Sequence, residues 1–236
     1  ERLRKTLGIP VERVTAEEPH FDADKEPLIL RALISSIKVF TTRADTIFGA
    51  SYLVLAPEHE LISKIKNQIS NWDEVVRYIE KTETKSEIER MGEGKEKTGV
   101  RLKGVKAVNP ATKEEIPIFV ADYVLSGYGT GAIMAVPAHD GRDLEFQRKY
   151  NQKIIPVVYP DKIMLDSDDA AELEKIGKQN LTQGASYLIS QRGAYVGEGI
   201  LINSGRFDGQ STEKARRLIT AEFGKEKVTF KLRNWV

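Results

Sequence analysis

The order of strand-like and helix-like segments is the feature that most constrains the fold of this chain. Short apolar or alternating runs predict strands at residues 36–42, 52–56, 104–108, 115–124, 132–136, 154–159, 199–202 and 227–232. Helical spacing predicts helices at residues 58–67, 72–91, 143–150, 166–178 and 211–223. Because strands and helices do not alternate with a regular βαβ period, a doubly wound parallel sheet is not favoured. We therefore predict an α+β fold with a mixed, curved β-sheet or small β-barrel core and peripheral helices.

The pattern also predicts how the chain is divided. Residues 1–35 are charged and weakly patterned, and we interpret them as a linker arm that begins with a short helix. Residues 36–236 are predicted to form one domain. Within it, residues 160–196 lack the strand pattern, and we interpret this helix and the glutamine- and glycine-bearing loop after it as an insertion. The chain does not begin with methionine, and we expect it to be part of a longer protein.

Composition excludes several classes of function. Of the 236 residues, 40% are hydrophobic and 30% are charged, which is typical of a globular protein with a core. The net charge of +1 provides no overall basic field for nucleic acid, so any such contact must use local patches. The absence of cysteine excludes disulfides, zinc–thiolate sites and thiol nucleophiles, and it fits a cytoplasmic protein. No apolar run approaches the roughly 20 residues of a membrane span.

A threonine-rich run directly follows the first predicted strand of the domain. Thr41, Thr42 and Thr46 lie beside Arg43 and Asp45 within six positions. Hydroxyl groups donate and accept hydrogen bonds, so they can bind an ester or carboxyl group and orient a water molecule. A single strand threonine needs no explanation beyond its β propensity. Three of them beside a cation and a carboxylate favour a small-molecule pocket.

A second unusual run begins with three alternating glycines at residues 127–131. Glycine lets the backbone approach a ligand closely or adopt positive φ. The run does not precede a helix, so it is not a dinucleotide-binding or P-loop motif. Tyr128 within it can stack on a base or close the edge of the core, and both interpretations stand.

The same run continues to His139, Asp140 and Asp143, which allow two kinds of chemistry. An imidazole with two carboxylates is a plausible ligand set for a metal. Alternatively, Asp143 can hold an ammonium group through a charge-assisted hydrogen bond. A purely structural alternative is that Asp143 caps the following helix and that Arg142 pairs with a nearby carboxylate. Only three histidines occur in the chain, so a metal site is not favoured.

In order along the chain, these motifs resemble the editing domain that is inserted in class I leucyl-tRNA synthetases. The residues that carry the resemblance are Thr-Thr-Arg-Ala-Asp-Thr at 41–46, Glu-Lys-Thr-Gly-Val at 96–100, Asn-Pro at 109–110, Ile-Pro-Ile at 116–118, Ala-Asp-Tyr-Val-Leu at 121–125, the run 127–146, Asn-Ser-Gly at 203–205 and Leu-Arg-Asn-Trp at 232–235. The resemblance covers about residues 36–236 and is of the bacterial type. Valyl and isoleucyl editing domains carry Glu or Trp where Asp45 stands.

The resemblance implies the editing-domain fold and hydrolysis of the ester in mischarged tRNA(Leu), such as norvalyl- or isoleucyl-tRNA. It implies that Asp143 binds the α-ammonium group, that Thr41 and Thr42 contact the ester and place the attacking water, and that Thr46 blocks leucine. Further substrate-binding residues that it implies are Met134, Val136, His139 and Asp140 at the side-chain pocket, Arg43 at the terminal phosphate, and Leu125 and Tyr128 at the adenine end.

The expected partners are the aminoacylated 3′ end of tRNA(Leu) and the rest of the synthetase, with no cofactor, metal or membrane. We expect the isolated chain to be monomeric. Ala44 stands where the family usually has proline. The chain lacks the His-Ile-Gly-His and Lys-Met-Ser-Lys-Ser signatures, so activation of leucine with ATP belongs to the parent enzyme. Two alternatives are a metal-dependent hydrolase that uses His139, Asp140 and Asp143, and a non-catalytic tRNA-binding module.

Overall fold

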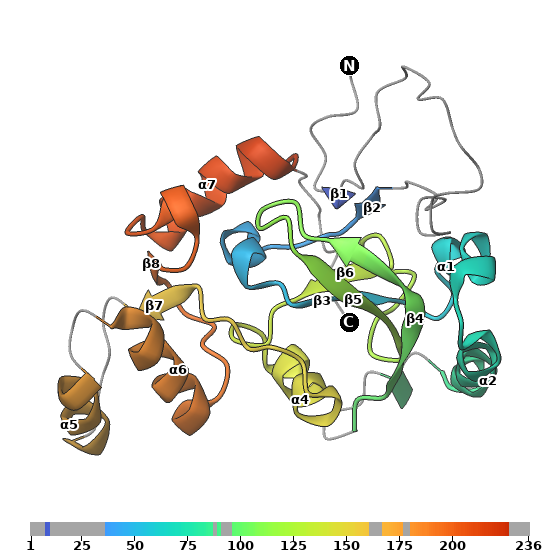
Figure 1. Cartoon of the computed structure of the whole chain (residues 1–236), viewed down its shortest axis with the longest axis horizontal. Helices are drawn as coiled ribbons and strands as arrows, with labels where there is room; N and C mark the ends of the chain where they lie inside the picture. Colours follow the sequence, from blue (N-terminus) through green and yellow to red (C-terminus); the bar gives the residue numbers. More distant parts are fainter. Residues whose placement is uncertain are drawn as a thin grey trace, which may run out of the picture.

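A four-stranded mixed sheet forms the centre of the molecule (Figure 1). The computed structural model describes residues 8–9, 36–86, 89–90, 96–160, 167–176 and 180–226. The strands lie in the order β4-β5-β3-β6, with bounds β3 (Tyr52–Leu55), β4 (Gly99–Val108), β5 (Glu115–Ala121) and β6 (Ala132–Ala135). β3 and β5 are parallel, and the other two pairs are antiparallel.

The α+β prediction with a mixed sheet is confirmed, but the barrel alternative is not found. Over the described residues the sheet ends at β4 on one side and at β6 on the other. β4 is the longest strand, and its register with β5 shifts between Arg101 and Lys106, at a bulge that contains Gly104 at φ +92. Residues 227–232, which were predicted to form a last strand, lie outside the described residues.

Both faces of the sheet are buried at β3, because its alternate side chains face two different clusters. Leu53 and Leu55 belong to the larger cluster, which also includes side chains from α1 (Glu60–Lys64), α2 (Trp72–Glu83) and α7 (Thr212–Phe223). Tyr52 and Val54 belong to the smaller cluster with Phe146 of α4 (Gly141–Tyr150). Here Tyr52 and Phe146 stack with ring centroids 5.5 Å apart. At β3 the sheet is therefore a middle layer between two clusters.

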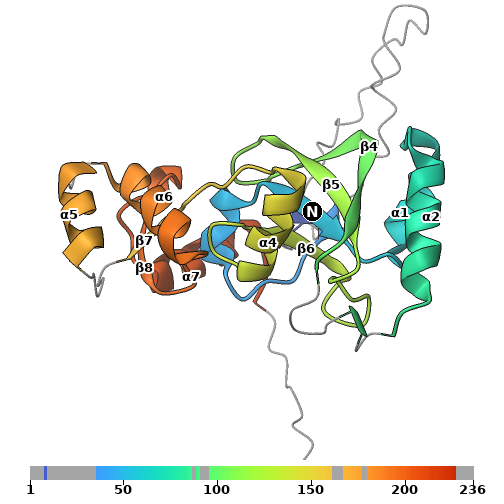
Figure 2. The same ribbon diagram turned by 90° about the horizontal axis from the view of Figure 1, so that it is seen from below.

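Helices α1 and α2, with the short η3 (Lys66–Gln68) between them, lie beside β4 (Figures 1 and 2). The helix predicted at 72–91 begins as expected but ends at Glu83. Asn71 precedes it without capping it. Its amide instead donates to Arg101 O at 2.9 Å and accepts from Lys103 N at 2.9 Å, which joins α2 to the edge strand.

A second group of elements lies beside the sheet (Figures 1 and 2). It consists of the antiparallel pair β7 (Val158–Pro160) and β8 (Gly199–Leu201) with α5 (Ser167–Ile176) and α6 (Leu181–Arg192). α5 confirms the predicted helix, but the predicted loop is the helix α6. The glycine in this segment favoured a loop, but Gly184 lies inside the helix. A Cβ atom there would meet Leu173 and Tyr159 at 3.2 and 3.3 Å.

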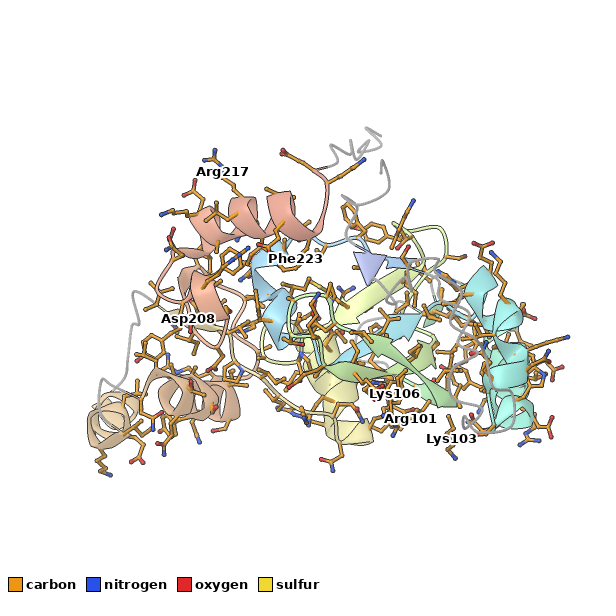
Figure 3. The ribbon with its side chains drawn as sticks, turned by 45° about the horizontal axis from the view of Figure 1, so that its top comes forward. Arg101, Lys103, Lys106, Asp208, Arg217 and Phe223 are labelled. Carbon is orange, nitrogen blue, oxygen red and sulfur yellow. The ribbon has the colours of Figure 1, made fainter. Side chains whose placement is uncertain are left out.

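Helix α7 packs on η2 (Ala44–Gly49), the short 3-10 helix formed by the threonine-rich run. Ser211 caps α7 as predicted, accepting from Lys214 N. Phe48 of η2 contacts Phe207 of η4 (Gly205–Phe207) and Phe223 of α7, with centroids 5.8 and 6.4 Å apart. In Figure 3, Phe223 points toward the body of the molecule while Arg217 points away from it.

Arg101, Lys103 and Lys106 are the exposed basic side chains of β4, and they lie on the side of the molecule away from α7 (Figure 3). Lys103 and Lys106 pair with Glu74 and Glu115 at 3.7 and 2.6 Å. These pairs offset part of the positive charge on this edge. Within the described part of the chain, no helix has the length and apolar character of a membrane span.

The strand predicted at 36–42 is shorter than expected. Only Ile37–Lys38 (β2) is a strand, and it pairs with Gly8–Ile9 (β1). The strand does not continue because the Thr41 hydroxyl accepts the N–H of Arg43 at 3.0 Å, which turns the backbone into η2.

Candidate functional site

The sheet topology brings the two unusual segments of the sequence to one edge. η2 leads into β3, and Tyr52 at the start of β3 pairs with Ala135 at the end of β6. Ser51 N–H also donates to Ala135 O at 3.1 Å. The turn after β6, which carries His139 and Asp140, therefore lies beside the threonine-rich segment.

The threonines take different positions around the start of η2. Thr46 is fully buried, and its hydroxyl donates to Arg43 O at 2.9 Å. Thr41 is half-buried and Thr42 is exposed. The Thr41 oxygen accepts a backbone N–H, so its own proton stays available to a second acceptor.

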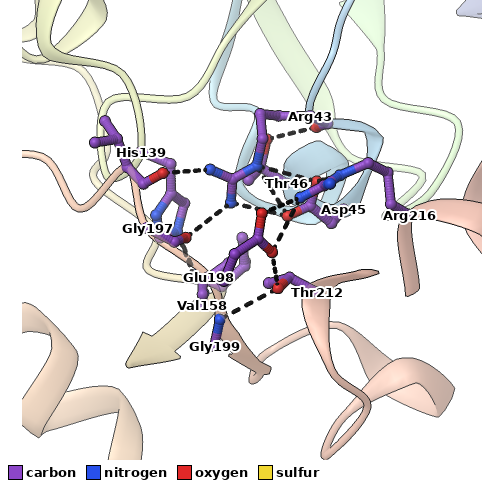
Figure 4. Close-up of polar contacts among 12 residues, drawn as sticks. Arg43, Asp45, Thr46, His139, Val158, Gly197, Glu198, Gly199, Thr212 and Arg216 are labelled. Atoms are coloured by element: carbon purple, nitrogen blue, oxygen red, sulfur yellow. Dashed lines mark hydrogen bonds and ion pairs between the residues drawn. The ribbon is translucent and has the colours of Figure 1, made fainter. Parts of the chain in front are cut away.

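Arg43 and Asp45 form a charge cluster with residues from α7 and the segment before β8 (Figure 4). Asp45 is fully buried and accepts from Arg43 Nε and Nη2 at 3.0 and 2.8 Å. It also accepts from Arg216 Nε at 3.1 Å. Arg216 in turn pairs with Glu198, and Glu198 accepts a hydrogen bond from Thr212. The cluster joins the threonine segment to α7.

Three consecutive backbone carbonyls, at residues 195–197, hold two of the predicted site residues. Tyr195 O contacts His139 Nδ1 at 2.9 Å. Val196 O and Gly197 O accept from the Arg43 guanidinium at 2.8 and 3.4 Å. The end of the segment that we interpreted as an insertion is therefore part of the wall of the candidate site. The Arg43 guanidinium points into this wall, and its approach to a phosphate stays a prediction.

Contacts at each end bracket the two leading threonines. On one side, the Phe40 ring meets Tyr128 edge-on, with centroids 6.1 Å apart. Phe40 also packs on Gly129, where a Cβ atom would lie 2.8 Å from the Phe40 Cβ and where φ is +66, so glycine is required. On the other side, Arg43 contacts the carbonyls beside His139. Residues 41 and 42 therefore run from the glycine turn to the carbonyls of residues 195–197, which also contact His139.

His139 is 4% exposed and is a structural link in this fold. Its Nε2 accepts from Val157 N and Val158 N at 2.9 and 3.3 Å. An acceptor Nε2 requires the proton on Nδ1, which then donates to Tyr195 O. Burial, and to a lesser degree the charge of Arg43, lowers the pKa of His139 to about 4, although the hydrogen bond to Tyr195 opposes this. The imidazole is therefore neutral at neutral pH.

This bonding argues against the metal alternative. A ring nitrogen that binds a metal must direct its lone pair at it, and in His139 one nitrogen carries the proton while the other accepts backbone N–H groups. Among the residues that the structure describes, no three side chains of metal-ligating type converge. In this arrangement, hydrogen bonds to the backbone occupy both ring nitrogens of His139.

Asp143 lies in the first turn of α4, below the turn after β6. Its Oδ1 accepts from the Tyr123 hydroxyl at 3.1 Å, and its Oδ2 accepts from Val136 N at 2.9 Å. Tyr52 donates to the main-chain oxygen of Asp143 at 2.9 Å. The cap of α4 is Asp140, which accepts from the N–H groups of residues 142 and 143, so the alternative that Asp143 caps this helix is wrong.

Asp143 is only 3% exposed, and its surroundings favour the neutral acid. Burial, followed by the negative charge of Asp140, raises the pKa of Asp143 to about 7. The Val136 N–H, the Tyr123 hydroxyl and Arg142 act in the opposite direction. Arg142 pairs with Asp140 at 3.3 Å, as one alternative predicted. A buried carboxyl group whose pKa lies near neutrality is typical of a functional site.

The remaining predicted residues lie on β6 or in the segments just before and after it. Met134 on β6 and Val136 just after it are buried. Leu125 is half-buried, and Tyr128 is 69% exposed at the glycine turn. An exposed aromatic ring is available for stacking, whereas the alternative that Tyr128 closes the edge of the core does not fit this exposure.

The sequence model of the family described as leucyl-tRNA synthetase, editing domain, matches residues 28–224. The chain belongs to this family. A leucine–tRNA ligase of Alkaliphilus oremlandii is 38% identical over 246 residues, covering all of this chain and 28% of that protein. A leucine–tRNA ligase of Rhodopirellula baltica is 44% identical over 205 residues, covering 85% of this chain and 20% of that protein. The chain thus spans 20% to 28% of the lengths of these relatives.

One solved structure is also similar to the editing-domain chain. It is the ternary complex of Agrobacterium radiobacter K84 agnB2 LeuRS, tRNA and LeuAMS, which is 30% identical over 67% of this chain and 18% of its own. The TM-score is 0.45, which is too low for a comparison of the two folds.

Several residues that build this editing-domain site escaped the sequence analysis. The carbonyls of residues 195–197 carry no side-chain signal. Glu198 and Arg216 contact the threonine segment from distant positions in the sequence. Tyr123 was part of a motif that carried the family resemblance, but its hydroxyl had no assigned role. Asn109, in the predicted Asn-Pro turn, donates to Ile47 O at 2.8 Å and so fixes the end of η2.

Proposed function

We propose that this chain hydrolyses the ester of mischarged tRNA(Leu), such as norvalyl- or isoleucyl-tRNA(Leu), and spares leucyl-tRNA(Leu). The observation that carries the proposal is the bracketing of Thr41 and Thr42 between the glycine turn and the carbonyls of residues 195–197, which also contact His139. Family membership supports the same activity. Because the chain spans only part of its relatives, we propose that it acts within a larger ligase that binds the tRNA.

The chemistry needs no protein nucleophile. A water oxygen attacks the ester carbonyl, the bond to the ribose oxygen breaks, and that oxygen takes a proton from the water. An aminoacyl ester is already activated, so positioning of the water can supply much of the acceleration. Thr41 retains a hydroxyl proton for the ester oxygen, and the exposed Thr42 hydroxyl is available to the water.

Asp143 is proposed to hold the α-ammonium group. Each of its oxygens accepts one hydrogen bond from the protein, which leaves further lone pairs for a cation. Asp143 is only 3% exposed, so the attraction between the two charges is stronger than in water. This contact would also favour the ionised carboxylate over the neutral acid.

The test is single-turnover hydrolysis of norvalyl-tRNA(Leu) with the chain in excess, which measures the chemical step even when binding is weak. The chain should hydrolyse the ester well above the spontaneous rate, and Asp143→Ala should lose at least about 100-fold. Glu145→Ala, an exposed position on the same helix, should retain the activity. Unchanged hydrolysis by Asp143→Ala would refute its role.

Two further results would support the other candidate functions. If chelator removed the activity and a metal ion restored it, the chain would be a metal-dependent hydrolase. If the chain bound tRNA(Leu) without any hydrolysis, it would be a binding module. We expect hydrolysis that chelator leaves unchanged.

A further inference from the structure

The hydroxyl of Tyr123 is a buried polar group that the proposed mechanism does not yet use. Tyr123 follows β5 and is 4% exposed. Its hydroxyl donates to Asp143 Oδ1 at 3.1 Å. Burial and the charge of Asp143 raise the pKa of Tyr123, so this hydroxyl keeps its proton and remains a donor.

We propose that Tyr123 is a positioning residue that holds the Asp143 carboxyl group in place and favours its ionised form. The inference rests on the proposed role of Asp143 in binding the ammonium group. With Val136 N–H on Oδ2 and Tyr123 on Oδ1, the carboxylate has one donor on each oxygen, which fixes its rotation. Both donors stabilise the charged form and so oppose the effect of burial on the pKa of Asp143.

Other groups around the Asp143 carboxyl group also affect its ionisation or contact the same residue. Asp140 at the start of α4 disfavours the charge, and Arg142 in the same turn favours it. Tyr52 on β3 also lies against Asp143, but its hydroxyl donates to the main-chain oxygen at 2.9 Å and not to the carboxylate. Tyr52 and Tyr123 are thus two buried tyrosines that bond the same residue at different atoms. Of these two tyrosines, only Tyr123 donates to the carboxylate.

This difference provides a matched pair of variants. Tyr123→Phe removes a donor to the charged group, so the pKa of Asp143 should rise. The acid limb of the pH profile for norvalyl-tRNA(Leu) hydrolysis should then move up by about one pH unit. Below the limb the rate should fall about tenfold, and above it the rate should approach that of the unmodified chain. Tyr52→Phe should leave the limb in place.

Titration of the Asp143 carboxyl carbon by NMR gives a second readout that needs no activity. Tyr123→Phe should raise its midpoint, and Tyr52→Phe should not. If Tyr123→Phe does not fold, 3-fluorotyrosine at position 123 keeps the ring and the hydroxyl while making it a stronger donor. This variant should move the midpoint down.

The two proposals fail in different ways. If the chain hydrolyses no mischarged tRNA(Leu), the proposed function fails, whereas the titration still measures the contact between Tyr123 and Asp143. If hydrolysis occurs but Tyr123→Phe shifts neither the acid limb of the pH profile nor the titration midpoint of Asp143, the positioning role of Tyr123 is overturned. The same conclusion follows if Tyr52→Phe shifts both by the same amount as Tyr123→Phe.

Discussion

Asp143 and His139 are two buried titratable groups whose effects on stability oppose each other. The pKa of Asp143 is raised to about 7, so the folded protein binds this proton more tightly than the unfolded chain does. Its contribution to stability is therefore lost as pH rises from about 4 to about 7. The pKa of His139 is lowered to about 4, so its contribution is lost as pH falls from about 6.5 to about 4.

Substitution of either group should remove its contribution to the pH dependence of the unfolding free energy. Relative to the unmodified chain, the unfolding free energy of Asp143→Asn should rise between pH 4 and 7, by up to about 1.4 kcal/mol per pH unit. That of His139→Gln should fall between pH 4 and 6.5. Urea unfolding at a series of pH values measures both differences. Differences that stay constant with pH for either variant would contradict the burial of that group.

The Asp45 cluster is a buried polar contact between helix α7 and η2. Asp45 has no exposure and pairs with Arg43 and Arg216, which come from different elements. Loss of the Asp45 carboxylate would leave the largely buried Arg43 guanidinium without its ion-pair partner, whereas Arg216 would keep its pair with Glu198.

Asp45→Ala should therefore lower the unfolding free energy by about 1 to 3 kcal/mol. Arg216→Gln should cost about 1 kcal/mol, because Arg43 still pairs with Asp45 and Arg216 is partly exposed. Arg217→Gln on the outer side of α7 is the matched control and should change the value by less than about 0.5 kcal/mol (Figure 3). Equal costs for the two arginine variants would show that the cluster does not stabilise this interface.

The turn between β4 and β5 supports the other end of η2. The Asn109 side chain is buried, donates to the carbonyls of Ile47 and Ala50, and accepts from Ala111 N. Asn109→Ala should cost about 1 to 3 kcal/mol because these groups lose their partner. The Ala50 amide, which bonds Ile47 O, should then exchange its hydrogen faster. Thr112→Ala in the same turn should leave that amide protected.

At the scale of the whole molecule, local patterns predicted the elements better than their assembly. The β3, β5 and β6 strands and the helix capped by Ser211 have clear apolar periods and turn residues, so their positions were confirmed. The barrel was not, because strand pairing depends on contacts between distant segments. α6 was missed because glycine is unfavourable in helices, and its place here comes from tertiary packing against Tyr159.

The site shows the same limit. The residue types of the threonine run and the Asp143 segment predicted a pocket at a strand end, and the topology brings those segments together. The carbonyls of residues 195–197 could not have been predicted, since every residue has one. Nor could the orientation of Arg43, which depends on Asp45 and that wall together.

The central claim is that this chain hydrolyses mischarged tRNA(Leu) and excludes leucine by the bulk of Thr46. The direct measurement is the ratio of single-turnover rates on norvalyl- and leucyl-tRNA(Leu) for the unmodified chain, Thr46→Ala and Thr46→Val. The unmodified chain should favour the norvalyl substrate by at least about tenfold. Thr46→Ala should also cleave leucyl-tRNA, whereas Thr46→Val, which keeps the bulk and loses only the hydroxyl bond to Arg43 O, should spare it. A chain that cleaves both substrates equally, or a Thr46→Ala variant that still spares leucyl-tRNA, would contradict the claim.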